Sequence, residues 1–333
     1  MSLNFVQQLF FKLFALIMSV VYSFNGGVVA PSTDDIIKAK NDDVKLVFAT
    51  LADPQVSNYM FDRYQALQEA CIDLRNADRL DVIVGVGDIA ENGLAEEYQL
   101  VYDELKGIAS RYIMAEGNHD IRLRAYSQSY SRFSAFTNAL NGDTSMTDNA
   151  YAEGKFAYSE VVNGYKFIVM GSDKMVFEEA YISPEQLAWI DAEIASVEDG
   201  MPVFVIVHQP LKLTHNLPTT WGNGTNKDAG SIGDQNDEVI EVLSKYADKK
   251  TVILINGHLH AGFSQYSYQK MEGGFHSVNA PAFSIENKDG EDGGNGSGIT
   301  YIVEVYDDEV LLRARNCRSG EWLTQWDTSI PLK

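Results

Sequence analysis

Residues that can bind metal ions recur in five short stretches of this sequence. The stretches read ADPQ, GVGDIAENG, EGNHD, VHQP and NGHLH, and they occupy residues 52–55, 85–93, 116–120, 207–210 and 256–260. They contain carboxylate, amide and imidazole side chains: Asp53, Gln55, Asp88, Asn118, His119, His208, His258 and His260. Four of the six histidines of the chain belong to this set, which indicates one shared site rather than scattered surface residues.

The donor atoms of this set indicate which metals it could bind. No thiolate is present, so hard or borderline ions such as Mn²⁺, Fe, Zn²⁺ or Mg²⁺ are favoured over soft ions and iron–sulfur clusters. The donors are too numerous for one tetrahedral ion. Two ions about 3.5–4 Å apart that share a bridging carboxylate would use them, and such a pair is suited to in-line displacement at phosphorus.

Each stretch ends a run of apolar, often β-branched residues that is typical of a buried strand. The predicted strands occupy residues 44–53, 81–88, 111–120, 202–210 and 251–260. The predicted helices occupy residues 59–77, 94–109, 183–197 and 237–247. This alternation predicts right-handed crossovers and a parallel sheet, whose carboxyl-terminal strand ends are where ligands bind. Alternation along the last strand would place His258 and His260 on one face.

The residue patterns in the rest of the chain predict a second sheet. Residues 155–172 are typical of a hairpin that turns at Asn163-Gly164. After residue 261 the helical patterns stop, and short strands separated by turn residues continue to the end of the sequence. We therefore expect an α/β protein with two packed sheets and helices on their outer faces. Residues 44–333 are expected to form a single domain with a β-rich C-terminal part.

The order of the motifs resembles that of the calcineurin-like metallophosphoesterase superfamily. The shared pattern is Asp-x-ligand, GDxxxxG, GNHD, HxP and GHxH, and it runs from about residue 44 to residue 265. The resemblance implies a four-layer α/β/β/α sandwich of the metallo-dependent phosphatase type. It also implies two divalent ions, one held by Asp53, Gln55, Asp88 and His260 and the other by Asp88, Asn118, His208 and His258.

In this family the bridging position corresponds to Asp88, and His119 acts on the substrate instead of on a metal. The resemblance implies that a hydroxide bridging the two ions attacks phosphorus and that His119 protonates the leaving oxygen as general acid. Gln55 departs from the family pattern, because most members have histidine there. A glutamine oxygen is a harder and weaker ligand than an imidazole nitrogen, so Mn²⁺, Mg²⁺ or Fe would be favoured over Zn²⁺.

The expected activity is hydrolysis of a phosphomonoester or a phosphodiester. One alternative is a phosphodiesterase specific for cyclic nucleotides or glycerophosphodiesters. A second alternative, from another class, is a catalytically impaired protein that binds a phosphorylated ligand, with Gln55 as the first altered position. Candidate substrate-binding residues are Asn92, Arg122 and His215 in the adjoining loops. For each there is an alternative: Asn92 could belong to the start of a helix, Arg122 could be a solvated surface residue, and the loop of His215 could pack on itself.

The charged residues of the chain limit the kinds of molecule that it can bind. The chain has 333 residues, with 26 Lys and Arg against 47 Asp and Glu, and its formal net charge is −21. Such a charge repels nucleic acid phosphates, so sequence-independent nucleic acid binding is not expected. A small phosphorylated substrate is compatible, because bound metal ions reverse the local field. Nothing in the sequence indicates the oligomeric state.

The N-terminal segment predicts export. Residues 13–24 form an apolar run that has the length of a signal peptide core and is too short for a membrane span. We expect a signal peptide over residues 1–30, a linker over 31–43, and an extracellular, periplasmic or cell-surface location. An uncleaved anchor and an N-terminal core helix are the alternatives. Cys71 and Cys317 have no metal-binding spacing. Cys71 is expected as a buried thiol and Cys317 as an edge-strand thiol, although their pairing is not decided.

Overall fold

The computed structural model describes residues 36–212, 214–215, 231–283 and 298–333, and within them two sheets contain all the strands. The first sheet has the order β12-β11-β10-β1-β2-β3, with β13 paired to β11, and the second has the order β4-β5-β6-β7-β9-β8. The strands are β1 Leu46–Leu51, β2 Val82–Val86, β3 Arg111–Ala115, β4 Tyr158–Val162, β5 Tyr165–Val169, β6 Pro202–Ile206, β7 Thr251–Asn256, β8 Tyr268–Lys270, β9 His276–Asn279, β10 Ile299–Val305, β11 Glu309–Asn316, β12 Glu321–Trp322 and β13 Thr328–Pro331.

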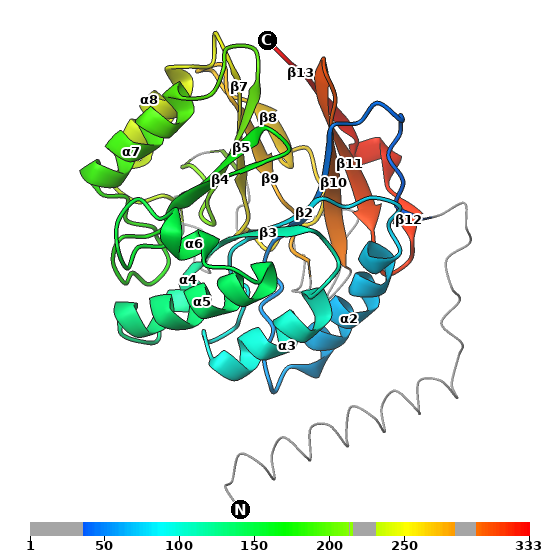
Figure 1. Cartoon of the computed structure of the whole chain (residues 1–333), viewed down its shortest axis with the longest axis vertical. Coiled ribbons are helices and arrows are strands. Elements are labelled where there is room, and N and C mark those ends of the chain that lie inside the picture. The colour runs from blue at the N-terminus through cyan, green and yellow to red at the C-terminus, as the bar shows by residue number, and fades with distance from the viewer. Residues whose placement is uncertain (1–35, 213, 216–230, 284–297) are drawn as a thin grey trace, which may run out of the picture. The chain divides into compact units, whose positions relative to one another are not determined.

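Helices cover the outer face of each sheet. They are α2 Phe61–Arg75, α3 Ala95–Leu105, α4 Asn118–Ile121, α5 Tyr126–Asn141, α6 Ser145–Asp148, α7 Pro184–Ala195 and α8 Asn236–Ser244, with a 3₁₀ turn η1 at Thr324–Trp326. Figure 1 shows α7 and α8 outside the second sheet and α2 and α3 outside the first, with the two sheets between them. The predicted four-layer α/β/β/α sandwich is confirmed.

The two sheets are mixed, which refines the expectation of parallel strands. Strands β1, β2 and β3 are parallel, and so are β5, β6, β7 and β9. Antiparallel strands extend both groups, with β10 beside β1, β4 beside β5 and β8 beside β9. Helical crossovers join the parallel neighbours of β1–β3 and of β5–β7, whereas the connection from β7 to its parallel neighbour β9 passes through a loop and β8. Short turns such as the one between β4 and β5 can only join antiparallel neighbours.

The core between the sheets is built on aromatic rings. Phe48 of β1 lies 5.5 Å from Phe167 of β5 and 5.0 Å from Phe204 of β6, measured between ring centroids. Along β6, Phe204 packs into this inter-sheet core while Val203 and Val205 pack into a second cluster under α7 and α8. Strands that are buried on both faces explain why their sequences are continuous apolar runs instead of alternating ones.

Several local predictions are confirmed by the structure. The hairpin of β4 and β5 turns at Asn163 and Gly164, which both have positive φ angles of 50° and 87°. Helix α7 begins with Ser183 as its N-cap, and the Ser183 side chain accepts a hydrogen bond from the backbone N–H of Gln186. The strand expected over residues 111–120 is wrong at its end, because β3 stops at Ala115 and the short helix α4 follows.

Residues Ile36–Lys333 form one compact unit. Within the segment expected as a linker, Ile37 is fully buried, and the backbone N–H of Lys40 donates to Glu304 Oε2 at 3.0 Å. Residues 1–35, with the predicted signal peptide, lie outside the described residues, and export stays a prediction. No helix in the described ranges combines the length and the apolar character needed to cross a membrane.

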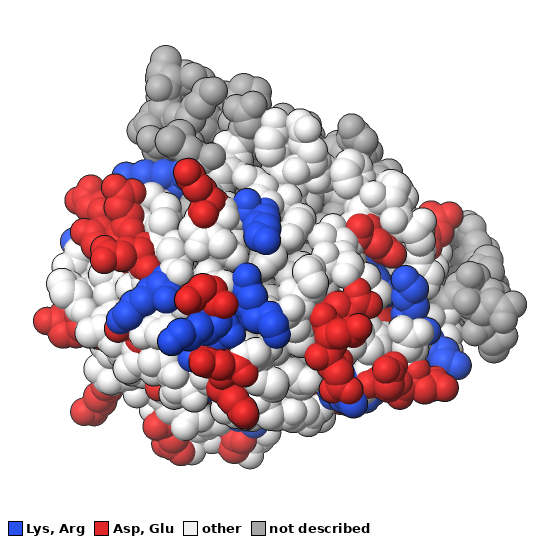
Figure 2. Space-filling model, turned by 90° about the horizontal axis from the view of Figure 1, so that it is seen from above, with Lys and Arg blue, Asp and Glu red and all other residues white. Residues whose placement is uncertain are grey.

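Charged side chains of both signs are mixed on one face of the molecule (Figure 2), and both cysteines are buried. Figure 2 shows one face of the molecule, on which Lys and Arg side chains lie among Asp and Glu side chains. Ion pairs in the described ranges include Lys166–Glu193 at 2.7 Å and Lys245–Asp191 at 2.7 Å. Cys71 and Cys317 are both buried free thiols, which confirms the expectation for Cys71 and shows that Cys317 is buried just after β11.

Candidate metal centre

The predicted ligands meet where the parallel strands of both sheets end. Asp53 and Gln55 follow β1, Asp88 follows β2, and Asn118 opens α4 just after β3. From the other sheet, His208 follows β6, whereas His258 and His260 follow β7. Each sheet therefore contributes one half of the cluster: carboxylates and amides come from the first sheet, and imidazoles come from the second.

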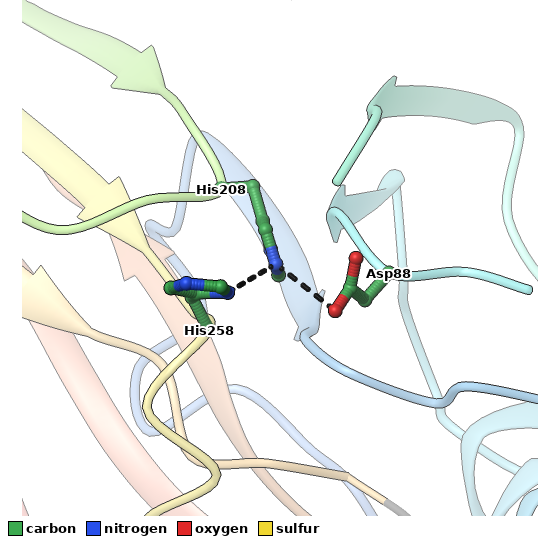
Figure 3. Close-up of side chains that lie close together, drawn as sticks. All are labelled: Asp88, His208 and His258. Carbon is green, nitrogen blue, oxygen red and sulfur yellow. Dashed lines mark hydrogen bonds and ion pairs between the residues drawn. The ribbon is translucent and has the colours of Figure 1, made fainter. Parts of the chain in front are cut away.

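Close contacts join the two halves. The His208 Nε2 atom lies 3.2 Å from Asp88 Oδ2, and the His258 Nδ1 atom lies 3.0 Å from His208 Nε2 (Figure 3). The His260 Nε2 atom lies 3.5 Å from Asp53 Oδ1. All of these side chains except His260 are fully buried.

The cluster divides into two groups that share one residue. Ligand atoms of Asp88, His208 and His258 lie within 4.8 Å of one another, and so do ligand atoms of Asp53, Asp88 and His260. Asp88 is common to both groups. This is the spatial arrangement that the sequence predicts for two metal positions with Asp88 between them.

Two amide oxygens complete the donor set. The Gln55 Oε1 and Asn118 Oδ1 atoms are buried, and neither has a hydrogen-bond partner among the described residues. The amide nitrogen of Gln55 donates to Asp88 Oδ2 at 3.0 Å, which places the Gln55 side chain beside the shared carboxylate. A buried carbonyl oxygen without a partner costs about 1–3 kcal/mol. Two such oxygens beside carboxylates and imidazoles fit a pair of divalent cations.

Hydrogen bonding to the backbone orients the central imidazole. His208 Nδ1 donates to the Val86 carbonyl at 2.8 Å, which turns its Nε2 atom toward Asp88 and His258. Metal-binding histidines are commonly held in this way. Burial lowers the pKa of His208, but Asp88 and Asp53 outweigh burial and raise the pKa to about 10. The centre of the cluster therefore favours positive charge.

The charges of the same cluster also change the pKa of Asp88. Burial alone raises the pKa of the Asp88 carboxyl, but the adjacent His208 and His119 rings bring that pKa well below its ordinary value. The backbone N–H of His119 also donates to Asp88 Oδ1 at 2.9 Å. The shared carboxylate is thus held in its charged form.

The backbone is strained at the ligand positions. Six non-glycine residues in the described ranges have positive φ angles, and one of them is the hairpin residue Asn163. The other five are all predicted ligands: Asp53, Gln55, Asp88, His258 and His260. Such conformations cost about 1–3 kcal/mol each and concentrate at functional sites. The expectation that His258 and His260 lie on one strand face is wrong, because β7 ends at Asn256 and both residues follow it, with positive φ angles of 70° and 48°.

Glycines before the ligands allow the strand ends to approach one another. A Cβ atom on Gly117 would lie 2.1 Å from Asp88 Oδ1, and one on Gly87 would lie 2.5 Å from the His208 ring. Gly87 also has a φ angle of +85°, which side chains rarely tolerate. The GD pair therefore reflects close packing between the two halves of the cluster, and the GN pair reflects close packing within the half that comes from the first sheet.

His119 faces the cluster without belonging to either group. Its Nε2 atom lies 3.9 Å from Asp88 Oδ2. Its Nδ1 atom lies 2.9 Å from the Glu91 carbonyl oxygen and 3.0 Å from Arg122 NH2. The carbonyl needs a proton on Nδ1, whereas the guanidinium needs a lone pair there, so only one of these two hydrogen bonds can form at a time.

The three candidate substrate-binding residues differ in their surroundings. Arg122 lies beside His119, and its Nε atom is buried without a hydrogen-bond partner among the described residues. The Asn92 amide nitrogen donates to Glu97 Oε1 at 2.9 Å, which ties Asn92 to the start of α3. His215 is buried in the loop that follows β6. That loop continues into residues 216–230, which lie outside the described residues and include Trp221.

Two carboxylates near the cluster were not identified from the sequence. Asp120 Oδ2 accepts from the backbone N–H groups of Gly117 and Ile89, at 2.9 and 3.2 Å, and so joins the GNHD segment to the GDxxxxG segment. Burial and the Asp88 charge raise the pKa of Asp120 to about 6. Glu178, from the loop between β5 and α7, accepts from the Asn118 amide nitrogen at 3.0 Å. Asp120 is the last residue of the GNHD motif, so the sequence could have indicated it. Glu178 belongs to no motif.

Comparison with known proteins gives the site a family. Residues 46–262 match the sequence model of the calcineurin-like phosphoesterase family. A protein of Arcobacter nitrofigilis named as a probable glycerophosphodiester phosphodiesterase is 22% identical over 202 residues, which cover 60% of this chain and 64% of that protein. A protein of Nostoc named as a 3′,5′-cyclic-nucleotide phosphodiesterase is 21% identical over 184 residues, covering 55% of this chain and 57% of its own length.

The chain spans less than two thirds of the length of these curated relatives. Among solved structures, the Plasmodium protein described as GAP50, the anchor in the inner membrane complex, superimposes with a TM-score of 0.52 at 12% identity. That match covers 86% of this chain and 89% of the other, and it supports the fold alone. Because the family match extends over residues 46–262 and includes all seven predicted metal ligands, the chain belongs to the calcineurin-like phosphoesterase family.

Proposed function

We propose that this protein is a metal-dependent hydrolase of phosphoesters that uses two divalent ions. The observation that carries the proposal is the position of Asp88, which is shared by two groups of ligand atoms. Gln55 and Asn118 each add a buried oxygen that lacks a partner among the described residues. Asp53, Gln55, Asp88 and His260 would hold one ion, and Asp88, Asn118, His208 and His258 would hold the other.

When bound, the two ions would lower the pKa of the attacking water and balance the charge of the phosphate oxygens. The side chains provide the remaining functions. His119 is positioned to act as general acid, since its Nε2 atom faces the cluster. As the water oxygen bonds to phosphorus and the ester P–O bond breaks, the proton on Nε2 passes to the leaving oxygen.

Arg122 would bind two phosphate oxygens through its Nε–H and Nη2–H groups, as a bidentate pair. The Nη2 group would then donate to the phosphate instead of to His119, so His119 Nδ1 can donate to the Glu91 carbonyl. The Nδ1 hydrogen bond would then keep the ring oriented while Nε2 carries the proton. Substrate binding would thereby select the arrangement of His119 that general acid catalysis requires.

A phosphodiester is the substrate class that we favour. Both curated relatives described above carry names of diesterases, one for glycerophosphodiesters and one for cyclic nucleotides. We infer that the present protein acts on a diester with a small alcohol or nucleoside group.

Metal analysis and turnover of one preparation test the proposal. The purified protein is freed of metal, reconstituted with Mn²⁺, Mg²⁺, Zn²⁺ or Fe²⁺, and assayed with bis-p-nitrophenyl phosphate and p-nitrophenyl phosphate. We expect two ions per chain and faster turnover of the diester. Faster turnover of the monoester would contradict the substrate class. A protein that binds no metal and hydrolyses neither compound would be a phospho-ligand binding protein instead.

A further inference from the structure

The loop between β5 and α7 reaches the metal centre through one side chain. Glu178 comes from this loop, and its carboxylate is half-buried between Asn118 and Arg122. The Asn118 amide nitrogen donates to Glu178 Oε2 at 3.0 Å, and Arg122 NH1 donates to Glu178 Oε1 at 3.3 Å. One carboxylate oxygen therefore accepts from Asn118 in the GNHD segment, and the other accepts from Arg122, two residues after that segment.

The first of these contacts determines which way the Asn118 amide points. A carboxylate can only accept hydrogen bonds, so Asn118 must turn its NH₂ group toward Glu178. The opposite end of the same amide is Oδ1, which is buried and has no hydrogen-bond partner in the described part of the chain. If the amide turned over, its NH₂ group would face the metal position and repel a cation.

The second contact holds Arg122 beside His119. The guanidinium carbon of Arg122 lies 5.3 Å from the centre of the Phe177 ring, in the same loop as Glu178. Phe177 and Glu178 thus contact the guanidinium from one loop, while Arg122 NH2 lies 3.0 Å from His119 Nδ1. The loop therefore positions the arginine that we expect to bind the substrate phosphate.

The backbone of Glu178 is tied to the second sheet. The Gln209 amide nitrogen donates to the Glu178 carbonyl at 3.2 Å, and Gln209 directly follows the ligand His208. An isolated, exposed ion pair contributes little to the stability of a protein. Glu178 differs from such a pair because one of its partners, Asn118, is fully buried and the second sheet holds its own backbone in place.

We propose that Glu178 is a positioning residue that directs the Asn118 oxygen toward the metal and holds Arg122 next to His119. The inference deepens the proposed function and rests on it, since the Asn118 oxygen needs a cation to face. Glu178 thereby couples the metal site that contains Asn118 to the site that binds the substrate phosphate.

The near-isosteric variant Glu178→Gln tests this coupling. A glutamine offers one acceptor and one donor, so it can satisfy either Asn118 or Arg122, but not both. We expect the affinity for the second Mn²⁺, measured by calorimetric titration of metal-free protein, to fall by about 10–100-fold. The kcat/KM for bis-p-nitrophenyl phosphate should fall with it.

The double variant Glu178→Gln with Arg122→Ala gives the sharper comparison. Without the arginine, the glutamine oxygen is free to accept from Asn118. The second Mn²⁺ should then bind with an affinity within about twofold of that of Arg122→Ala alone. Glu179→Gln, at the exposed neighbouring position, is the matched control and should bind both ions like the wild type.

The results separate this inference from the proposed function. If the wild type binds two ions and turns over the diester while Glu178→Gln and Glu178→Ala match it in Mn²⁺ affinity and kcat/KM, Glu178 has no positioning role. If the double variant remains as weak as Glu178→Gln, the orientation argument is wrong. A wild type that binds no Mn²⁺ would overturn both proposals, and circular dichroism of each variant verifies that it is folded.

Discussion

Two of the buried clusters of charged residues in the described part of the chain differ in their chemistry. One is the pair of Asp73 on α2 and Arg315 on β11, which are 3% and 0% exposed. Arg315 Nε donates to Asp73 Oδ2 at 2.9 Å, and NH2 donates to Oδ1 at 2.7 Å. The other is the metal centre, where the Gln55 and Asn118 oxygens lack partners among the described residues.

The difference shows which cluster serves the fold and which is reserved for a ligand. Asp73 and Arg315 lie in a regular helix and a regular strand, and their opposite charges match in a bidentate geometry. The metal centre combines unmatched oxygens with five strained backbone positions, which cost stability unless something else compensates. A pair of cations would provide that compensation. Four variants test this comparison.

The largest effect is expected from Asp88→Asn. The substitution removes the shared negative charge and one acceptor oxygen, so both ions should bind weakly. Turnover of bis-p-nitrophenyl phosphate should fall by at least about 10³-fold. Elemental analysis after gel filtration measures the metal content, with Asp103→Asn on the exposed side of α3 as control. Two ions still bound to Asp88→Asn would count against the shared position of this carboxylate.

His119→Ala should lose activity and keep metal. If His119 is the general acid, turnover should fall by about 10²–10⁴-fold. The loss should be larger for a methyl ester than for a p-nitrophenyl ester, because a poor leaving group depends more on protonation. His276→Ala is the control, since His276 bonds to Tyr268 on the edge of the second sheet. Equal losses for both esters would remove His119 from the acid role.

Asp73→Ala should affect stability and leave the metal centre unchanged. Loss of the Asp73 carboxylate beside the buried charge of Arg315 should lower the free energy of unfolding by about 3–5 kcal/mol, measured by urea denaturation. Replacing both partners, as Asp73→Leu with Arg315→Met, should recover most of that loss because no charge stays buried. Loss of bound metal in Asp73→Ala that still folds would show that the two clusters are not independent.

Gln55→His should have the smallest effect. An imidazole nitrogen binds Zn²⁺ better than an amide oxygen does, so the affinity for Zn²⁺ should rise by about tenfold relative to Mn²⁺. Competition with a chromophoric chelator measures the ratio, and Gln99→His on the surface of α3 is the control. An unchanged ratio would mean that residue 55 does not contact the metal.

The sequence predicted the main elements of this site because motif and strand end coincide. Asp53, Asp88 and His208 each follow an apolar run, and parallel strands bring their carboxyl ends together. The sequence pattern placed the strand ends two to five residues too late, because Asp88 lies beyond the end of β2 and Asn118 begins the short helix α4, and apolar periodicity does not mark either boundary. His258 and His260 were wrongly expected on one strand face, since both follow the end of β7.

Other residues were beyond the reach of sequence reasoning. Glu178 is one of 47 acidic residues, and only the path of the β5–α7 loop places it beside Asn118. Arg315 and Asp73 are 242 positions apart and have no pattern in common. Side-chain contacts of this kind depend on the packing of layers, which local periodicity does not encode.

By itself, the sequence determined the alternation of strands and helices along the chain, the two packed sheets with outer helices and the identity of the donor atoms, because these follow from local patterns and side-chain chemistry. The tertiary structure alone decided that the Gln55 and Asn118 oxygens are left without partners in the described chain and that Glu178 contacts Asn118. These features arise where two sheets meet, and the distances between atoms of different layers are set only when the layers pack.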